Sequence, residues 1–190
     1  MPVTRAAGRP HLALLRGINV GGKNIIEMTA LRACFEAAGC TQVATYIQSG
    51  NVVFHAPGRR RPLAALRATL EAALATRFGY AARLVLLDRA QVARVVAEAP
   101  AGFGGEPARY RYDVLFVRAP MTAARALAEL RPREGVDTVA AGTLALYARR
   151  LIARAAQSHL TKLVQLPVYQ DLTIRNWNTT TALARMMALA

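Results

Sequence analysis

Cysteine, histidine, serine and lysine are all scarce in this chain, and each shortage argues against a class of function. The two cysteines, Cys34 and Cys40, are too few for a disulfide framework, and Cys34 is predicted to be a buried, reduced thiol. The three histidines stand far apart without partners at metal-ligand spacing, so we predict no metal site and no cofactor. The two serines lie outside any Gly-x-Ser-x-Gly motif, which argues against a serine hydrolase.

Long apolar runs are missing as well. No stretch approaches 18 consecutive apolar residues, and the segment at positions 1–10 lacks the apolar core of a signal peptide. We therefore predict no membrane association and a cytoplasmic location. A hydrophobic fraction of 54% with 19% charged residues is typical of a globular protein rather than a disordered one.

Acidic residues are few, and the resulting charge imbalance is large. Eleven acidic residues face 25 basic ones, which gives a formal charge of +14 and suits phosphate-bearing partners. All basic residues except Lys23 and Lys162 are arginine. A compositional preference for arginine explains its use over lysine but not the shortage of acids, so the charge gives modest support to nucleic-acid binding.

The first half of the chain alternates between strand and helix signals. Short β-rich runs predict strands at 11–18, 43–47, 51–55 and 83–87, and a tight turn joins the second and third of them. Helical periodicity with glycine or proline boundaries predicts one helix from 28 and another from 62. This order is that of the ferredoxin-like unit, βαββαβ.

The second half repeats this order, and a glycine- and proline-containing stretch at 99–107 precedes it. Its predicted elements lie at 110–117, 122–130, 137–140, 143–148, 159–166 and 172–174, with a final helix from about Asn178. We thus predict an α+β protein with two ferredoxin-like subdomains, antiparallel sheets and a C-terminal helix. The predicted boundaries are 9–87 for the first subdomain, 88–108 for a linker helix and loop, and 109–190 for the second.

A glycine-rich loop follows the first predicted strand. Residues 17–24, GINVGGKN, fit part of a phosphate-binding P-loop, but Asn24 replaces the serine or threonine that would hold magnesium. Gly21 and Gly22 nevertheless permit backbone N–H groups to point at one anion, with Arg16 and Lys23 beside them. The structural alternative is a tight connection that needs glycine for its geometry alone.

The hairpin turn is predicted to meet this glycine loop. In a ferredoxin-like unit the first and second strands run parallel, so the segments that leave them lie at the same sheet edge. Charged and amide donors would converge there and hold a small phosphate- or carboxylate-bearing ligand. The predicted binding residues are Arg16, Asn19, Gly21, Gly22, Lys23, Gln48, Ser49 and Asn51.

Weak, sequence-indifferent nucleic-acid binding is the alternative. RNA-recognition modules share this strand order and stack bases on aromatic side chains of the two central strands. The strands at 11–18 and 51–55 offer only His11 and Phe54, so such a platform is missing.

Elsewhere, Trp177 is interpreted as a buried anchor for the last helix, Asn178 as its N-cap and Ser158 as a helix cap.

Three motifs carry a family resemblance. LLRGINVGGKN, TYIQSGNVVF and TIRNWNT make the chain similar to the uncharacterised bacterial family catalogued as domain of unknown function 1697. The resemblance implies a pair of ferredoxin-like subdomains and no established activity, so it assigns neither a reaction nor catalytic residues. Where that family tends to show Gly-x-x-Arg-Ser-Lys-Leu, this chain has AQSHL at 156–160, with Lys162 the nearest lysine.

Overall fold

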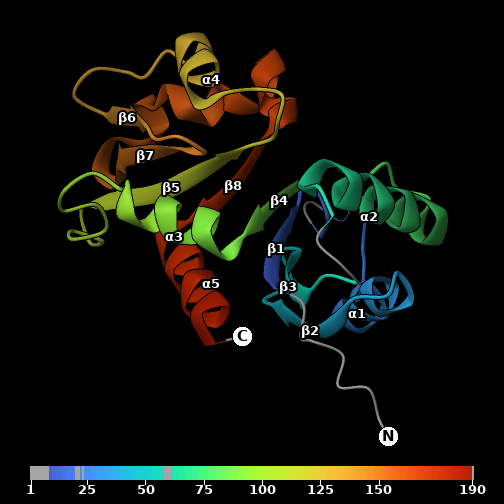
Figure 1. Ribbon diagram of the computed structural model, residues 1–190. Helices are drawn as coiled ribbons and strands as arrows, with labels where there is room; N and C mark the ends of the chain where they lie inside the picture. The colour runs from blue at the N-terminus through green and yellow to red at the C-terminus, as the bar shows by residue number, and fades with distance from the viewer. Residues whose placement is uncertain (1–8, 20–21, 23, 58–60, 190) are drawn as a thin grey trace, which may run out of the picture. The chain divides into compact units, whose positions relative to one another are not determined.

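The computed structural model describes residues 9–19, 22, 24–57 and 61–189, and the chain forms two compact units (Figure 1). The first unit comprises residues 1–89 and 185–190, and the second comprises residues 90–184. Each unit contains one four-stranded antiparallel sheet. Within the described residues, no helix has the length and apolar character needed to span a membrane.

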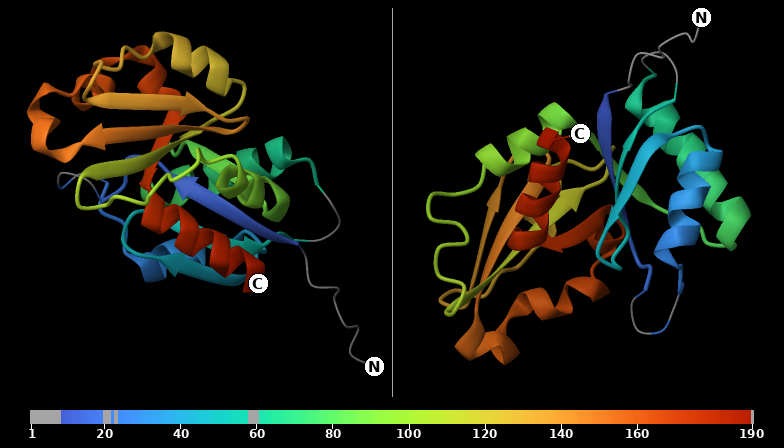
Figure 2. Two further views of the ribbon diagram at one scale, coloured as in Figure 1. Left: turned by 90° about the vertical axis from the view of Figure 1, so that its left-hand side faces the viewer. Right: turned by 90° about the horizontal axis from the view of Figure 1, so that it is seen from below.

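The first sheet has the strand order β2-β3-β1-β4, which is that of a ferredoxin-like unit. Its strands are β1 (Pro10–Leu15), β2 (Thr41–Tyr46), β3 (Asn51–His55) and β4 (Leu84–Asp88). The helices α1 (Met28–Ala37) and α2 (Leu63–Phe78) both lie on one face of this sheet (Figure 2).

Helical periodicity explains how α1 and α2 cover the sheet. The buried residues of α1 are Leu31, Cys34 and Phe35, and those of α2 are Leu66, Leu70 and Leu74. Residues three or four apart lie on one helix face, so each helix presents an apolar stripe to the strands. The helix α2 ends at Gly79, whose left-handed backbone (φ 61°) suits glycine.

Both cysteines belong to this core, as predicted for Cys34. Cys34 and Cys40 are buried and unbridged, and burial raises the pKa of the Cys40 thiol to about 12. A thiol held in its neutral form is a poor nucleophile.

The second sheet repeats the arrangement of the first, with the order β6-β7-β5-β8. Its strands are β5 (Tyr110–Val117), β6 (Asp137–Ala141), β7 (Ala145–Leu151) and β8 (Leu172–Asn176). The remaining helices are α3 (Arg89–Ala97), α4 (Ala123–Glu129) and α5 (Trp177–Leu189). The predicted α+β class with two related antiparallel sheets and a C-terminal helix is therefore confirmed.

The helix predicted at 159–166 is present as a 3-10 segment, and two further short 3-10 segments flank it. These segments are η1 (Ile152–Gln157), η2 (His159–Gln165) and η3 (Pro167–Asp171). Ser158 and Leu166 interrupt them with extended backbone. Leu166 precedes a proline, which disfavours the helical conformation at that position.

The helix ends also correct one capping assignment. Helix α5 begins at Trp177, and the Oδ1 atom of Asn176 accepts a hydrogen bond from the Thr179 N–H at 2.8 Å. Asn176 rather than Asn178 is therefore the N-cap. The prediction for Ser158 is confirmed, because its Oγ atom accepts from the Leu160 N–H at 3.1 Å at the start of η2.

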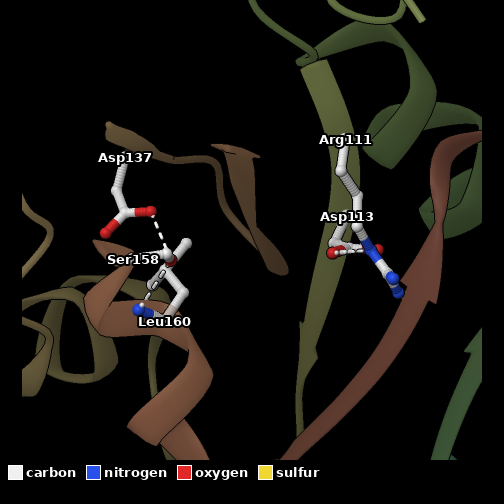
Figure 3. A network of polar contacts seen from close by, with 5 residues as sticks. All are labelled: Arg111, Asp113, Asp137, Ser158 and Leu160. Carbon is white, nitrogen blue, oxygen red and sulfur yellow. Dashed lines mark hydrogen bonds and ion pairs between the residues drawn. The ribbon is translucent and has the colours of Figure 1, made fainter. Parts of the chain in front are cut away.

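Replacing Ser158 with alanine is expected to destabilise the protein by about 1–3 kcal/mol, since it removes this cap and a buried bond. The Ser158 hydroxyl also donates to the Asp137 carboxylate at 2.6 Å (Figure 3). Urea denaturation measures the change. The matched variant is Thr69→Ala, whose exposed hydroxyl donates only to its own helix, and it should change stability by less than about 0.5 kcal/mol. Equal losses for the two variants would contradict the prediction.

Candidate functional site

The glycine loop and the hairpin turn of the first unit meet through the Asn19 side chain. Its Nδ2 atom donates to the Gln48 carbonyl at 3.1 Å and to the Ile26 carbonyl at 3.0 Å. Its Oδ1 atom accepts from the Ile26 N–H at 2.8 Å. Asn19 thus joins the two segments at one edge of the sheet, and its amide is occupied in doing so.

Asn51 holds the hairpin turn from within. Its side chain is wholly buried, and the Nδ2 atom donates to the Tyr46 carbonyl and to the Ser49 hydroxyl, both at 2.9 Å. The amide of Asn51 is therefore directed into the turn rather than toward solvent. Its position suits support of the turn better than contact with a ligand.

Left-handed backbone conformations are concentrated in these two segments. Positive φ angles occur at Gly17, Asn19, Gly22, Asn24, Ile47 and Gly50. A β-branched residue rarely adopts this conformation, so Ile47 (φ 49°) stores strain of the kind found at functional sites. Gly50 is required by packing as well, because a Cβ atom there would lie 2.7 Å from the Leu15 Cβ.

The other predicted binding residues vary in how accessible they are. Gln48 and Gly22 are exposed, whereas Arg16 and Ser49 are half-buried. The carbonyl of Arg16 accepts a hydrogen bond from the Tyr80 hydroxyl, whose pKa is raised by burial. Gly21 and Lys23 lie outside the described residues.

Two exposed isoleucines at this edge were missed by the sequence analysis. Ile25 is 73% exposed and Ile47 is 52% exposed, values that are high for large apolar side chains. Ile25 precedes Ile26, and Ile47 precedes Gln48. The Asn19 side chain donates hydrogen bonds to the carbonyl groups of Ile26 and Gln48. The edge therefore combines polar loops with an apolar rim.

The second unit contains an aromatic cluster that the sequence analysis also missed. Phe103 makes edge-to-face contacts with Tyr112, Tyr147 and Trp177, at centroid distances of 4.9, 5.6 and 5.2 Å. Tyr112 and Tyr147 lie on the two central strands of the sheet, β5 and β7. The central strands of the first sheet, β1 and β3, carry His11 and Phe54 instead. The two tyrosines are buried, however, and the pKa of Tyr147 is raised by burial to about 12.

A cleft of about 270 Å³ lies beside this cluster. It is lined by Gly104, Pro107, Tyr110, Arg111, Tyr112, Asn176, Trp177 and Asn178. Trp177 is mostly buried, as predicted, and it also lines this cleft. The alternation of Tyr110, Tyr112 and Phe116 along the predicted strand was the available sequence signal.

Charged groups near this cleft form a local network. The Nε atom of Arg111 lies 2.8 Å from the Asp113 Oδ2 atom, and 57% of the Arg111 side chain is exposed (Figure 3). Screening by solvent makes such an exposed pair weak. The described residues include no group of three or more histidine, cysteine or acidic side chains suited to a metal ion.

Comparison with known proteins places the chain in a family. The model described as "Protein of unknown function (DUF1697)" matches residues 9–147. The chain belongs to this family. The DUF1697 chain is also similar to the conserved bacterial protein SP0830 from Streptococcus pneumoniae, with a TM-score of 0.82 and 26% identity. The similarity covers 96% of this chain and 99% of that one. No curated protein matches.

Proposed function

We propose that this protein binds a small phosphate- or carboxylate-bearing ligand at the glycine-loop edge of its first unit. The observation that carries the proposal is the Asn19 side chain, which joins Ile26 to Gln48 of the hairpin turn through its hydrogen bonds. Segments that are already joined before a ligand arrives avoid part of the entropy cost of binding.

The roles of the residues follow from their contacts. Asn19 and Asn51 position the two segments, because their amides bond to backbone or side-chain groups of the same unit. Gln48 and Ser49, on the turn, are the candidate neutral donors, with Gly21 and Gly22 supplying backbone N–H groups. Arg16 and Lys23 supply the positive charge that attracts an anion.

Lys23 offers the sharpest test, because the chain has one other lysine. Lys23→Ala is expected to weaken anion binding about tenfold or more, the equivalent of about 1.4 kcal/mol or above. Lys162→Ala removes the same charge from an exposed position in the second unit and should leave binding unchanged. Calorimetric titrations with inorganic phosphate and with acetate, at low ionic strength, compare the two ligand chemistries.

The outcomes of this experiment are distinct. Saturable binding that Lys23→Ala weakens and Lys162→Ala does not supports the proposal, and the tighter of the two anions indicates the ligand class. Equal weakening by both substitutions would mean that only net charge matters. Wild-type affinity in Lys23→Ala, or no saturable binding of either anion, would overturn the proposed site.

Weak nucleic-acid binding is the second candidate function, and the charge of +14 favours it. Binding of this kind releases counterions, so its affinity should fall steeply as the salt concentration rises. The central-strand tyrosines of the second sheet are buried, which leaves them unable to stack bases. Fluorescence anisotropy with several unrelated oligonucleotides should give similar affinities for all of them. Selective binding that persists at high salt would contradict this second function.

A further inference from the structure

We propose that the cleft beside Trp177 in the second unit binds a nucleotide. This inference concerns a different site from the glycine-loop edge and stands independently of it. The cleft volume of about 270 Å³ lies just below the range of about 300–1,000 Å³ for small-molecule sites, so a nucleotide would bind with part of its surface in solvent.

The indole of Trp177 supplies a rigid ring surface at the cleft. Phe103 contacts it edge-on at 5.2 Å with an interplanar angle of 87°, and a Cβ atom on Gly104 would lie only 2.3 Å from the indole Cδ1 atom. These contacts fix one side of the ring, while its exposed part borders the cleft. Stacking on such a ring is worth about 1–3 kcal/mol per base in single-strand binding proteins.

Planar cationic groups lie over the ring of Tyr110, which lines the same cleft as Trp177. The guanidinium carbons of Arg149 and Arg109 lie 4.5 and 5.0 Å from the centre of the Tyr110 ring. Guanidinium planes stack on bases as aromatic rings do, and they attract phosphate. Arg111 lines the cleft with its side chain more than half exposed. A ligand that is both flat and anionic matches this combination.

Backbone groups of β5 also face the cleft. The pairing of β5 with β8 ends at Asp113 opposite Asn176, so Tyr110–Tyr112 lie beyond the last paired residue. Arg118 donates its N–H to Asp171 on the β8 side, whereas Val117 donates to Leu144 on the β7 side. Because this direction alternates along a strand, the even-numbered Tyr112 directs its backbone N–H toward this side, where the β5–β8 ladder has ended. This N–H can donate to an acceptor on the edge of a base.

The loop that closes the cleft is held at its start. The carboxylate of Glu98 accepts hydrogen bonds from the Thr143 N–H at 2.7 Å and from the Thr143 hydroxyl at 2.6 Å. These bonds lower the pKa of Glu98, which keeps it ionised at neutral pH. The loop from Glu98 to Pro107 is thus attached to the turn between β6 and β7. The cleft walls are accordingly formed before any ligand binds.

Trp177 is the only tryptophan in the chain, so its fluorescence reports on this cleft alone. The probes are adenosine 5′-monophosphate, adenosine, ribose 5-phosphate and a short single-stranded oligonucleotide with a 5′-phosphate. Adenosine 5′-monophosphate should quench the fluorescence saturably. Adenosine lacks the phosphate and ribose 5-phosphate lacks the ring, so each should bind at least tenfold more weakly. Tighter binding of the oligonucleotide than of the mononucleotide would identify a strand end as the source of the nucleotide, and the reverse would identify a free nucleotide.

Matched variants separate this site from general electrostatic attraction. Arg111→Gln should weaken nucleotide binding about tenfold or more, whereas Arg125→Gln, which removes an exposed guanidinium from α4, should not change it. Tyr110→Leu should also weaken binding, with thermal melting confirming that each variant is folded. Equal losses for Arg111→Gln and Arg125→Gln, equal affinity for ribose 5-phosphate and the nucleotide, or no saturable quenching would each overturn the proposal.

Discussion

Replacing Gly104 with alanine is expected to destabilise the second unit by about 2–5 kcal/mol, the largest single effect that we predict. Two costs combine at this position. The backbone is left-handed (φ 90°), and the new methyl group would lie 2.3 Å from the Trp177 Cδ1 atom and 2.5 Å from its Nε1 atom. The indole is a rigid neighbour held by Phe103, so it would have to move.

Gly102 provides the control for this experiment. It is left-handed as well (φ 72°), but a Cβ atom there would meet nothing within 4 Å. Gly102→Ala should therefore cost only the backbone term, about 1–2 kcal/mol. Urea denaturation gives the free energies of unfolding, and the fluorescence maximum of Trp177 should shift in Gly104→Ala alone. Equal losses with unshifted fluorescence would contradict the packing of Gly104 against the indole.

Replacing Asn51 with alanine is expected to cost about 2–4 kcal/mol, because two bonds of a buried amide are lost together with their packing. The partners left behind are the Tyr46 carbonyl and the Ser49 hydroxyl. Thermal or urea denaturation measures this change. Gln48→Ala, at an exposed position in the same turn, should stay within about 0.5 kcal/mol of the wild type.

This second prediction bears on how the proposed anion site is tested. A loss of ligand binding in Asn51→Ala would follow from a distorted turn, even if the amide never contacts a ligand. Lys23→Ala and Gln48→Ala are therefore the informative variants for binding. If Asn51→Ala melted at the wild-type temperature, the buried role of this amide would be wrong, and a direct ligand contact would regain support.

Most of the fold could be predicted because its signals are local. The runs at 51–55 and 110–117 are bounded by turn residues, and their predicted limits agree with β3 and β5. The apolar spacing of Leu66, Leu70 and Leu74 likewise specifies a helix and its buried face. The meeting of the glycine loop and the turn followed from topology, since parallel strands end at one sheet edge.

The parts that could not be predicted depend on tertiary contacts. Asparagine is a good N-cap residue, so Asn176 and Asn178 were both candidates. Asn176 is the N-cap because β8 ends at this residue and α5 begins at the next one. The hydrogen bonds of the Asn19 and Asn51 side-chain amides depend on which backbone carbonyl groups the fold brings next to them. The cleft arises where Trp177 meets Gly104, residues that are far apart in the sequence.

The strand order has a consequence for the way in which each half of the protein folds. The first strand of each unit, β1 or β5, is a central strand that pairs with both the third and the fourth. The pairing of Leu15 with Leu84 closes a loop of about 70 residues, so the first sheet depends on contacts of high sequence separation, which slow folding. During synthesis, the hairpin of β2 and β3 can form early, whereas β1 must wait for β4 to emerge from the ribosome before both of its edges are covered. Removing β1 would therefore separate β4 from the rest of the sheet rather than trim an edge.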